Sequence, residues 1–593
     1  MNYLNASAVL AFVMLLVACK PEPSTDQIDY KRTENSVAVR LEADVANLNP
    51  LVSKTGYESQ VIWQLYTYPC SFDYETLEFI PETLKELPVI EETTASGAPG
   101  KYAIRAEILE EAVWSDGTPV TAADYLFTIK AMLNPLVDAA RYRVVFNTLD
   151  LSAITLDEER PKQFTVYLNS TSILDLETLF NLLPILPRHI MDSEGWLAEI
   201  ALADLMDTER ADVLATSDEN LQAFAQQLAD PEFARDIAKL TGSGPYEIVD
   251  WVTGQRVTLQ RKNNWWGDQV SKETHPSLVA YPEELVYRPI DDPTAALAAL
   301  KSEEIDVMNR IPESEFEALK EDSVAGERYQ LEAISSMVVY YYSFNTDNPK
   351  LADPRVRQAI ANAADIDEIL QTVYLGYGER TASPVLPSQA YYNEELPIIR
   401  QDIEKAKQLL AEAGWEDTNN NGIVDKEIEG EQMELSIEVL TSQTENSRNT
   451  ALLLKDQLEQ AGIDLQPKAV TGTVLLTNWR NKEYEVASVG SSVTPVWHPG
   501  QSWYSQGGSN RTGFGTAKSD AMIDEILVTF DLEKRKELYE DLQQEIYEQQ
   551  PVLFLYVPQT TVAVHNRFEA PLTNIFPCYD PRYFKLKEAF QEL

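Results

Sequence analysis

The stretch that decides the fold is TGSGPYEIVDWVTGQRVTLQRKNNWWGD, which occupies residues 241–268. It begins with a Gly-Ser-Gly-Pro cluster, where the chain is expected to turn. Residues 246–252 are rich in aromatic and β-branched side chains, which favours a strand, although Asp250 breaks the alternation of apolar and polar residues. A turn at residues 253–255 and clean alternation over residues 256–261 complete the pattern. The stretch therefore predicts a β-hairpin that ends beside two tryptophans and a glycine.

A second ordered segment, WSDGTPVTAADYLFT, occupies residues 114–128. Its Asp-Gly-Thr-Pro predicts a turn, and Thr121 is a good helix N-cap. Asp124 falls in the first helical turn, where the helix dipole stabilises a carboxylate. The segment predicts a turn followed by an amphipathic helix with a structural role.

These two segments together resemble the family 5 solute-binding proteins, which are the peptide, dipeptide and nickel receptors of bacterial ABC importers. Four further segments resemble the same family: LPILPRHI (183–190), FNT with VRQAI (344–360), EKAKQLLAEAGW (404–415) and VLFLYV (552–557). All of these segments occur along the chain in the order that the family has. One departure is Glu303, which stands where the family usually has glycine.

The resemblance implies an α/β, two-lobe periplasmic-binding-protein fold of type II, cluster C-like, with an extra subdomain in the first lobe. The implied divisions are a lipoprotein signal peptide with lipobox (1–19), a flexible tether (20–35), lobe I (36–315) with the extra subdomain at about 60–188, lobe II (316–555) and a return to lobe I (556–593). The lobes are expected to close over a ligand by a hinge motion, with crossings near Pro312 and Tyr556.

The N-terminus has the pattern of an exported lipoprotein. Residues 8–18 form an apolar run that is long enough for a signal peptide and too short to span a bilayer comfortably. The run ends in LVAC, which resembles a lipobox with Cys19 as the lipidated residue, although no Lys or Arg precedes it. The resulting expectation is a protein of the cell envelope that is anchored by lipid alone. The alternative is a soluble protein with a cleaved signal and an incidental cysteine.

Composition and motifs limit the function classes. The 593-residue chain carries a formal net charge of -47, which repels nucleic acid phosphates. This acidity fits either attraction of cationic substrates or solubility alone. The chain has four His and neither H-E-x-x-H nor G-x-S-x-G, so we expect no enzyme, no catalytic residue and no cofactor.

The resemblance places the ligand in a cleft lined by several segments. In the first lobe it implies the loop residues Lys54, Thr55 and Gly56, and Tyr142 is a further aromatic candidate. Near the C-terminus it implies Tyr556, for which packing in the core is an equal alternative.

The segment YEVASVGSSVTPVWHP (484–499) bears most directly on ligand choice. In oligopeptide receptors the matching segment holds an Arg and an Asp, and the Asp pairs with the free amino group of the peptide. The alignment puts Ser488 and Thr494 at these positions, so both charges are absent. A buried ammonium without a carboxylate is costly, which puts the usual amine anchor in doubt. Gly490, Ser491, Ser492 and Trp497 complete the candidate wall, which fits a neutral ligand as well as a peptide.

Two further features leave alternatives open. Cys70 and Cys578 form a disulfide or remain two buried thiols, since an exported protein permits either. The loop DTNNNGIVD begins like a calcium loop, with Asp417, Asn419, Asn421 and Asp425 as candidate ligands. Its twelfth position is Ile428 instead of the bidentate Glu that completes such a site.

The expected function is capture of an oligopeptide or related small polar solute, followed by delivery to ABC permease subunits by a monomeric receptor. The alternatives are a receptor for an oligosaccharide or a metal chelate, and a sensory or chaperone-like binder without transport.

Overall fold

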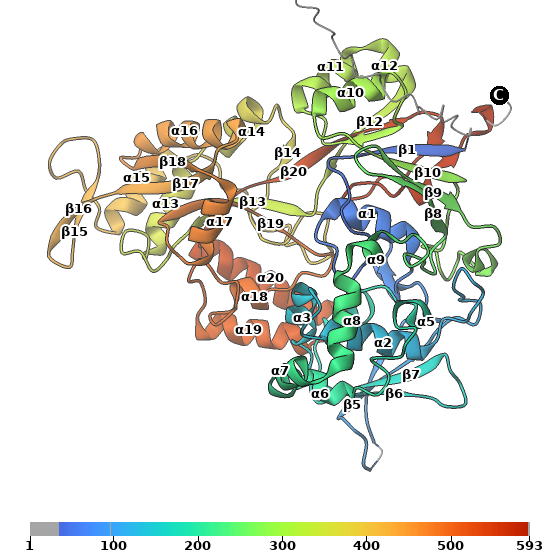
Figure 1. The fold of residues 1–593 in the computed structure, drawn as a ribbon. Helices are drawn as coiled ribbons and strands as arrows, with labels where there is room; N and C mark the ends of the chain where they lie inside the picture. Colours follow the sequence, from blue (N-terminus) through green and yellow to red (C-terminus); the bar gives the residue numbers. More distant parts are fainter. Residues whose placement is uncertain (1–34, 95, 591–593) are drawn as a thin grey trace, which may run out of the picture.

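The computed structural model of the protein describes residues 35–94 and 96–590. The predicted signal peptide, Cys19 and nearly all of the tether lie outside these residues. The described chain is an α/β protein with two lobes, and one mixed sheet runs through both of them (Figure 1). No helix in the described part of the chain combines the length and apolar character needed to cross a bilayer.

The central sheet of the described residues has twelve strands. Its main path runs in the order β18 (Asp464–Val470), β17 (Ser436–Ser442), β19 (Val486–Ser492), β13 (Val338–Phe344), β20 (Val552–His565), β11 (Val307–Asn309), β1 (Ser36–Leu41), β10 (Glu284–Pro289), β9 (Arg256–Arg261) and β8 (Tyr246–Val252). Two more strands, β12 (Tyr329–Ser335) and β14 (Gly378–Glu379), pair with β20 beside this path. The first part of β20 pairs with β13 and its last part with β12 and β11, so one strand joins the two lobes.

The predicted hairpin is confirmed as β8 and β9. The imperfect alternation at Asp250 has a structural cause, because the register shifts between Ile248 and Asp250. Such a bulge turns the following side chains to the other face. Asp250 is thereby placed 2.7 Å from the guanidinium of Arg256.

The turn before this hairpin packs against the end of α1 (Gly56–Leu65). The backbone N–H of Gly244 donates to the carbonyl of Leu65 at 2.9 Å. A Cβ on Gly244 would lie 2.6 Å from the carbonyl carbon of Leu65, which is closer than any side chain can approach. The glycine is therefore required by this contact.

The first-lobe part of the sheet is covered on both faces. Val37 and Val39 of β1 point into a core shared with α1, while Ala38 points into a second core. The second core is formed with α10 (Pro293–Lys301), α11 (Glu313–Glu321) and α12 (Ser323–Arg328).

An extra subdomain extends from the first lobe (Figure 1). Its sheet has the order β4 (Ile90–Glu92), β5 (Tyr102–Glu107), β7 (Gln163–Leu168) and β6 (Leu151–Leu156). Its helices are α2 (Ala122–Leu133), α3 (Ala140–Phe146), α4 (Asp175–Phe180), α5 (Arg188–Met191), α6 (Leu202–Met206), α7 (Thr208–Ser217), α8 (Glu219–Ala229) and α9 (Pro231–Arg235). Phe127 of α2 meets Phe224 of α8 edge to face at 5.8 Å, so the subdomain includes helices well beyond the predicted limit of residue 188.

The second lobe carries helices on both faces of its strands, and two apolar cores lie between them. Its helices are α13 (Pro354–Ala363), α14 (Ile366–Val373), α15 (Ile403–Glu412), α16 (Glu445–Glu459), α17 (Gly472–Arg480), α18 (Gly500–Trp503), α19 (Ala517–Val528) and α20 (Leu532–Gln549). The pairs β2 (Cys70–Phe72) with β3 (Phe79–Pro81), β15 (Asp425–Ile428) with β16 (Glu431–Glu434), and β21 (Phe568–Glu569) with β22 (Lys585–Leu586) are separate ribbons.

The packing of residues 316–335 supports a lobe boundary later in the chain than the predicted residue 315. Phe316, Leu319 and Tyr329 pack in the core beneath the first-lobe strands, and β12 pairs with the first-lobe end of β20. The next strand, β13, pairs with the second-lobe end of β20. We therefore propose that the first crossing between the lobes lies at residues 336–337.

Candidate functional site

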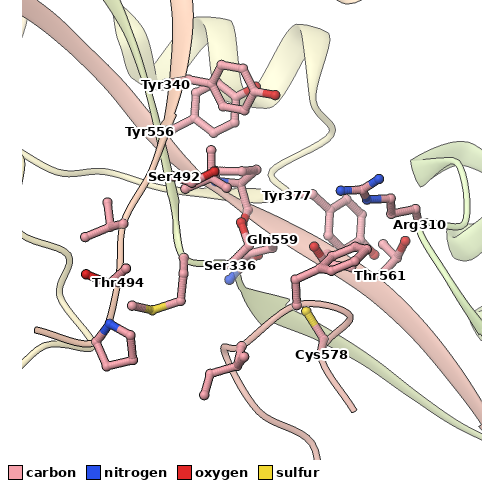
Figure 2. A pocket seen from close by; sticks show the side chains of 18 of the residues that line it. Arg310, Ser336, Tyr340, Tyr377, Ser492, Thr494, Tyr556, Gln559, Thr561 and Cys578 are labelled. Carbon is pink, nitrogen blue, oxygen red and sulfur yellow. The ribbon is translucent and has the colours of Figure 1, made fainter. Parts of the chain in front are cut away.

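A cavity of about 880 Å³ lies where the two lobes meet. This volume falls in the usual range for small-molecule sites. The lining residues from the first lobe are Trp63, Phe72, Glu177, Asn181, Arg310, Ile311, Pro312, Glu313, Ile575, Phe576 and Cys578. Those from the second lobe and the crossing strands are Ser336, Met337, Val338, Tyr340, Tyr374, Tyr377, Ser492, Val493, Thr494, Pro495, Tyr556, Pro558, Gln559, Thr560 and Thr561. Figure 2 shows ten of these residues by name.

Tyrosine rings form one wall of the cavity. Tyr340 of β13 stacks on Tyr556 of β20 with ring centroids 5.4 Å apart (Figure 2). Tyr374 also meets Tyr556, with ring centroids 4.6 Å apart and ring planes inclined by 46°. Gly490 of the neighbouring strand leaves room for this arrangement, since a Cβ there would lie 2.9 Å from the ring of Tyr340. The wall offers flat apolar surface with phenol groups at its edge.

Hydroxyl groups surround the crossing between the lobes. Thr561 donates to the carbonyl of Ile311 at 2.6 Å, and Ser336 donates to that of Pro558 at 2.9 Å. These bonds tie β20 to Ile311, which follows β11, and to Ser336, which follows β12. Ser492 and Gln559 add further polar groups to the same wall (Figure 2).

The charged groups of the cavity have a negative excess. Of the three charged lining residues, Arg310 is already paired, because its guanidinium donates to both carboxylate oxygens of Glu42 at 3.1 and 3.2 Å. The same guanidinium lies 4.8 Å above the ring of Phe576. Glu177 and Glu313 are carboxylates, and burial raises the pKa of Glu177 to about 7.

A smaller compartment of about 290 Å³ adjoins the main cavity. The two share Trp63, Phe72, Asn181 and Ile575 in their linings. Its deepest charge is Glu82, whose pKa burial raises to about 7 against the opposing effect of Arg582, 3.8 Å away. A ligand in the main cavity therefore has room to extend into this smaller compartment.

Three of the candidate residues from the sequence lie on the cavity wall: Ser492, Thr494 and Tyr556. Thr494 is exposed to the cavity, and its hydroxyl donates to the carbonyl of Val496 at 2.6 Å. Tyr556 is only 4% exposed and packs in the second-lobe core, so it has both of the roles that the sequence left open.

The four first-lobe candidates are not among the lining residues. Lys54 forms an exposed ion pair with Asp138 at 2.5 Å, and Thr55 caps α1. Gly56 lies behind the wall, where a Cβ would be 3.1 Å from the ring of Phe576. Tyr142 donates its hydroxyl to the carbonyl of Pro50 at 3.0 Å, a structural bond within the first lobe.

The remaining candidates near the end of β19 also lie behind the wall. Gly490 supports the ring of Tyr340, and Ser491 points to the opposite side of the sheet from Ser492. Trp497 is buried against Tyr539, whose hydroxyl donates to the carbonyl of Trp497 at 2.7 Å. Strand alternation explains why Ser492 lines the cavity and Ser491 does not, and the ring of Tyr340 covers Gly490.

The predicted calcium loop is held together by its own hydrogen bonds. The carboxylate of Asp417 accepts from the backbone N–H groups of Asn421 and Gly422 at 3.1 and 2.9 Å. Asp425 accepts from both the backbone and the hydroxyl of Thr418, and Asn421 donates its amide to a Glu434 carboxylate. The amide oxygen of Asn419 accepts from the backbone N–H of Asn421 at 3.0 Å, so all four candidate ligands already form hydrogen bonds that hold the loop. Within residues 35–94 and 96–590 no three His, Cys, Asp or Glu side chains gather so as to hold a metal ion.

The disulfide between Cys70 and Cys578 is not formed in the structure. Both thiols are free and buried. They lie in the same first-lobe core but in different surroundings, since Cys578 lines the cavity, whereas Cys70 lies in β2 near Glu82. Burial raises the pKa of Cys578 to about 11, which keeps the thiol protonated.

Comparison with known proteins identifies the family. The family model described as bacterial extracellular solute-binding proteins, family 5 middle, matches residues 103–513. The chain belongs to this family of solute-binding proteins.

Individual relatives bind different solutes. The oligopeptide-binding protein AppA of Bacillus subtilis is 28% identical over 355 residues, which cover 58% of this chain and 61% of AppA. Heme-binding protein A of Haemophilus influenzae is 26% identical over 318 residues, covering 52% of this chain and 53% of that protein. These matches span less than two thirds of either relative.

Solved structures of similar fold extend over nearly the whole chain. AppA from Bacillus subtilis in complex with a nonapeptide has a TM-score of 0.65 at 22% identity and covers 93% of this chain and 99% of its own. NikA from Brucella suis in complex with Fe(III)-EDTA has a TM-score of 0.69 at 18% identity, covering 93% and 100%. At this identity the likeness establishes the fold, and the choice of ligand depends on the residues of the cavity.

Proposed function

We propose that the protein captures a short peptide or a related small polar solute in the cavity between its lobes and delivers it to an ABC permease. The observation that carries this proposal is the cavity itself, which takes its lining from both lobes at the point where the chain crosses between them. Rotation about residues 336–337 and about the middle of β20 would open and close it.

The cavity walls support a ligand that is polar along its length and has at least one flat or apolar part. Stacked tyrosine rings can pack against such a part, while the hydroxyl groups near the crossing can bind carbonyl and N–H groups. A peptide has this chemistry. An oligosaccharide or a metal chelate also has this chemistry. These ligands remain alternatives because Thr494 lines the cavity at the position where oligopeptide receptors are expected to have an Asp.

We further propose that Cys19 is lipidated and holds the receptor at the cell envelope through its lipid alone, as a monomer. The sequence LVAC supports this anchor.

A sensory or chaperone-like role without transport would use the same cavity. Uptake of the identified ligand by a deletion strain separates the two roles, because loss of uptake supports the importer and normal uptake contradicts it.

The ligand class is tested by thermal unfolding of the full-length protein in detergent with peptides of two to six residues, oligosaccharides and metal chelates. A ligand at about 100 times its dissociation constant stabilises the folded state by about 2.7 kcal/mol, which is readily measured. Stabilisation by peptides supports the proposal. Stabilisation by sugars or chelates alone would retain the receptor and replace the peptide with that class.

A further inference from the structure

Glu177 lies on a short helix of the extra subdomain that reaches the boundary between the lobes. The helix, α4, is fixed at its start by Asp175, whose carboxylate accepts from the backbone and hydroxyl of Ser172 at 2.7 and 2.8 Å. Leu179 and Phe180 are buried in the first-lobe core. Glu177 and Asn181, four residues apart on one helix face, both line the cavity.

The second lobe contacts the extra subdomain just before α4. The backbone N–H of Ile173, just before α4, donates to the carbonyl of Leu527 in α19 at 2.9 Å. Tyr539 of α20 is also close, because the charge of Glu177 adds to the effect of burial in raising the pKa of this phenol. Glu177 therefore lines the cavity on a first-lobe helix whose start is hydrogen-bonded to the second lobe.

The carboxylate of Glu177 has no compensating charge. Among the described residues, no cationic side chain contributes to its pKa, which is raised by burial alone. Its closest polar neighbour on the helix, Asn181, already donates its amide to the carbonyl of Cys70 at 2.8 Å. Glu177 is half-buried, and a partly desolvated carboxylate without a partner is costly in free energy, so a cation supplied by a ligand would remove that cost.

We propose that Glu177 binds a cationic group of the ligand, an ammonium or a guanidinium, and so selects ligands that carry one. This inference rests on the proposed function, because it names the chemistry of the solute that the cavity takes. The only cationic lining residue, Arg310, is paired with Glu42, so the cavity of the described chain offers a ligand two carboxylates and no free cation. The carboxylate comes from the first lobe, and Thr494 comes from the second. A ligand held by Glu177 and by the tyrosine wall would touch both lobes and favour the closed form.

The test uses matched pairs of probes that differ in one charge. Affinities of full-length protein in detergent are measured by calorimetry for trialanine and N-acetyl-trialanine, and for a glucosamine trisaccharide and its N-acetylated form. The wild-type protein is expected to bind the cationic member of a pair at least about thirtyfold more tightly, as expected for a desolvated charge pair. Glu177→Gln keeps the shape of the side chain and should abolish this preference. Glu158→Gln, which removes a charge from an exposed turn between β6 and β7, should preserve it.

Each outcome supports or overturns the inference. Equal affinity for both members of a pair in the wild-type protein overturns it, and so does an unchanged preference in Glu177→Gln. Loss of the preference in Glu313→Gln alone would assign the cation to Glu313 and overturn it as well. If neither the peptide pair nor the sugar pair binds to wild type, the proposed ligand classes fail together with the inference, a result distinct from binding without preference.

Discussion

Tyr340 and Tyr556 lie face to face on neighbouring strands, with ring centroids 5.4 Å apart and ring planes inclined by 17°. The two rings differ in burial, since Tyr340 is 38% exposed and Tyr556 is 4% exposed. Tyr556 is the inner ring and touches the core, while Tyr340 presents its outer face to the cavity. Tyr556 therefore contributes more to stability than Tyr340, although both rings line the cavity.

Tyr556→Ala should destabilise the protein by about 3–5 kcal/mol, because it removes a buried aromatic side chain and leaves a cavity between Tyr340 and Tyr374. Tyr340→Ala should cost much less stability and should weaken ligand binding. Chemical denaturation gives the first quantity and calorimetry the second. Equal loss of stability in both variants would contradict the assignment of inner and outer rings.

Gly244→Ala should destabilise the protein strongly, by about 2 kcal/mol or more, because the new Cβ would lie 2.6 Å from the backbone of Leu65. Gly326→Ala is the matched control. Gly326 lies within α12 with no atom near its Cβ position, so alanine there should stabilise the helix by up to about 1 kcal/mol. Urea denaturation of both variants measures the difference. A Gly244→Ala variant as stable as wild type would show that the hairpin does not dock on α1 as described.

The sequence was most informative where local chemistry alone sets the structure. The hairpin at residues 246–261 and the helix after Thr121 follow from turn residues, alternation and caps, and both are present. Glu303 stands where the family usually has glycine. Its φ is +60°, in the left-handed region that favours glycine, so the local backbone conformation explains the usual residue. The two-lobe fold itself came from the resemblance and the order of its segments.

The cavity lining depended on tertiary contacts that sequence patterns do not carry. Trp63, Tyr340 and Phe576 were missed because an aromatic residue in a helix, strand or loop has the same pattern whether it faces a core or a cleft. Glu177 had no sequence signal either, since DLETLF is an ordinary amphipathic helix start. The first-lobe loop was expected to line the cavity. Instead, Thr55 caps α1 and Lys54 pairs with Asp138, and sequence patterns did not indicate these contacts. Period-two alternation within Gly490–Ser492 was the one available signal that would have separated Ser491 from Ser492.

Glu177→Gln should raise the stability of the unliganded protein at high pH and leave it unchanged at low pH. The pKa of Glu177 is raised from 4.5 to about 7 by burial, so the folded state binds the proton more tightly than the unfolded state. The stabilisation from this proton is complete below about pH 4.5 and is lost as pH rises through about 7. At pH 8 the carboxylate should cost about 3 kcal/mol at most, which the glutamine removes.

The measurement is the difference in melting temperature between wild type and Glu177→Gln from pH 5 to pH 8. Tyr539, which faces Glu177 from α20, stays neutral over this range because burial holds its pKa above its usual value. Glu82, Arg310 and Glu313 are present in both proteins, so their effects cancel. A difference that does not grow with pH would contradict an unpaired, buried carboxylate.

Thr494→Asp should restore a preference for cationic ligands to the Glu177→Gln variant. Thr494 is exposed to the cavity, so an aspartate there can reach a bound ammonium, although it loses the hydrogen bond to the carbonyl of Val496. We expect about tenfold tighter binding of trialanine than of N-acetyl-trialanine in the double variant, measured by calorimetry. Equal affinities would show that the two positions do not face the same part of the ligand.

Cys19→Ala should release the protein from the membrane fraction, because the chain would lose the residue that carries the proposed lipid. Cell fractionation followed by immunoblotting measures this. Cys578→Ala is the control and should leave fractionation unchanged, since that thiol is buried in the first lobe. Membrane association that survives in Cys19→Ala would rule out lipidation at this residue.

The central claim is that a solute binds in the cavity between the lobes, and the most direct test fills that cavity. Ser492 lines the cavity and is exposed, so Ser492→Trp occupies the space with little change to the core. Ser217→Trp, on the exposed surface of α7, is the matched control. Calorimetry with the ligand found by thermal unfolding should give at least about tenfold weaker binding to Ser492→Trp and unchanged binding to Ser217→Trp, with equal melting temperatures in the absence of ligand. Unchanged affinity in Ser492→Trp would place the ligand elsewhere and contradict the claim.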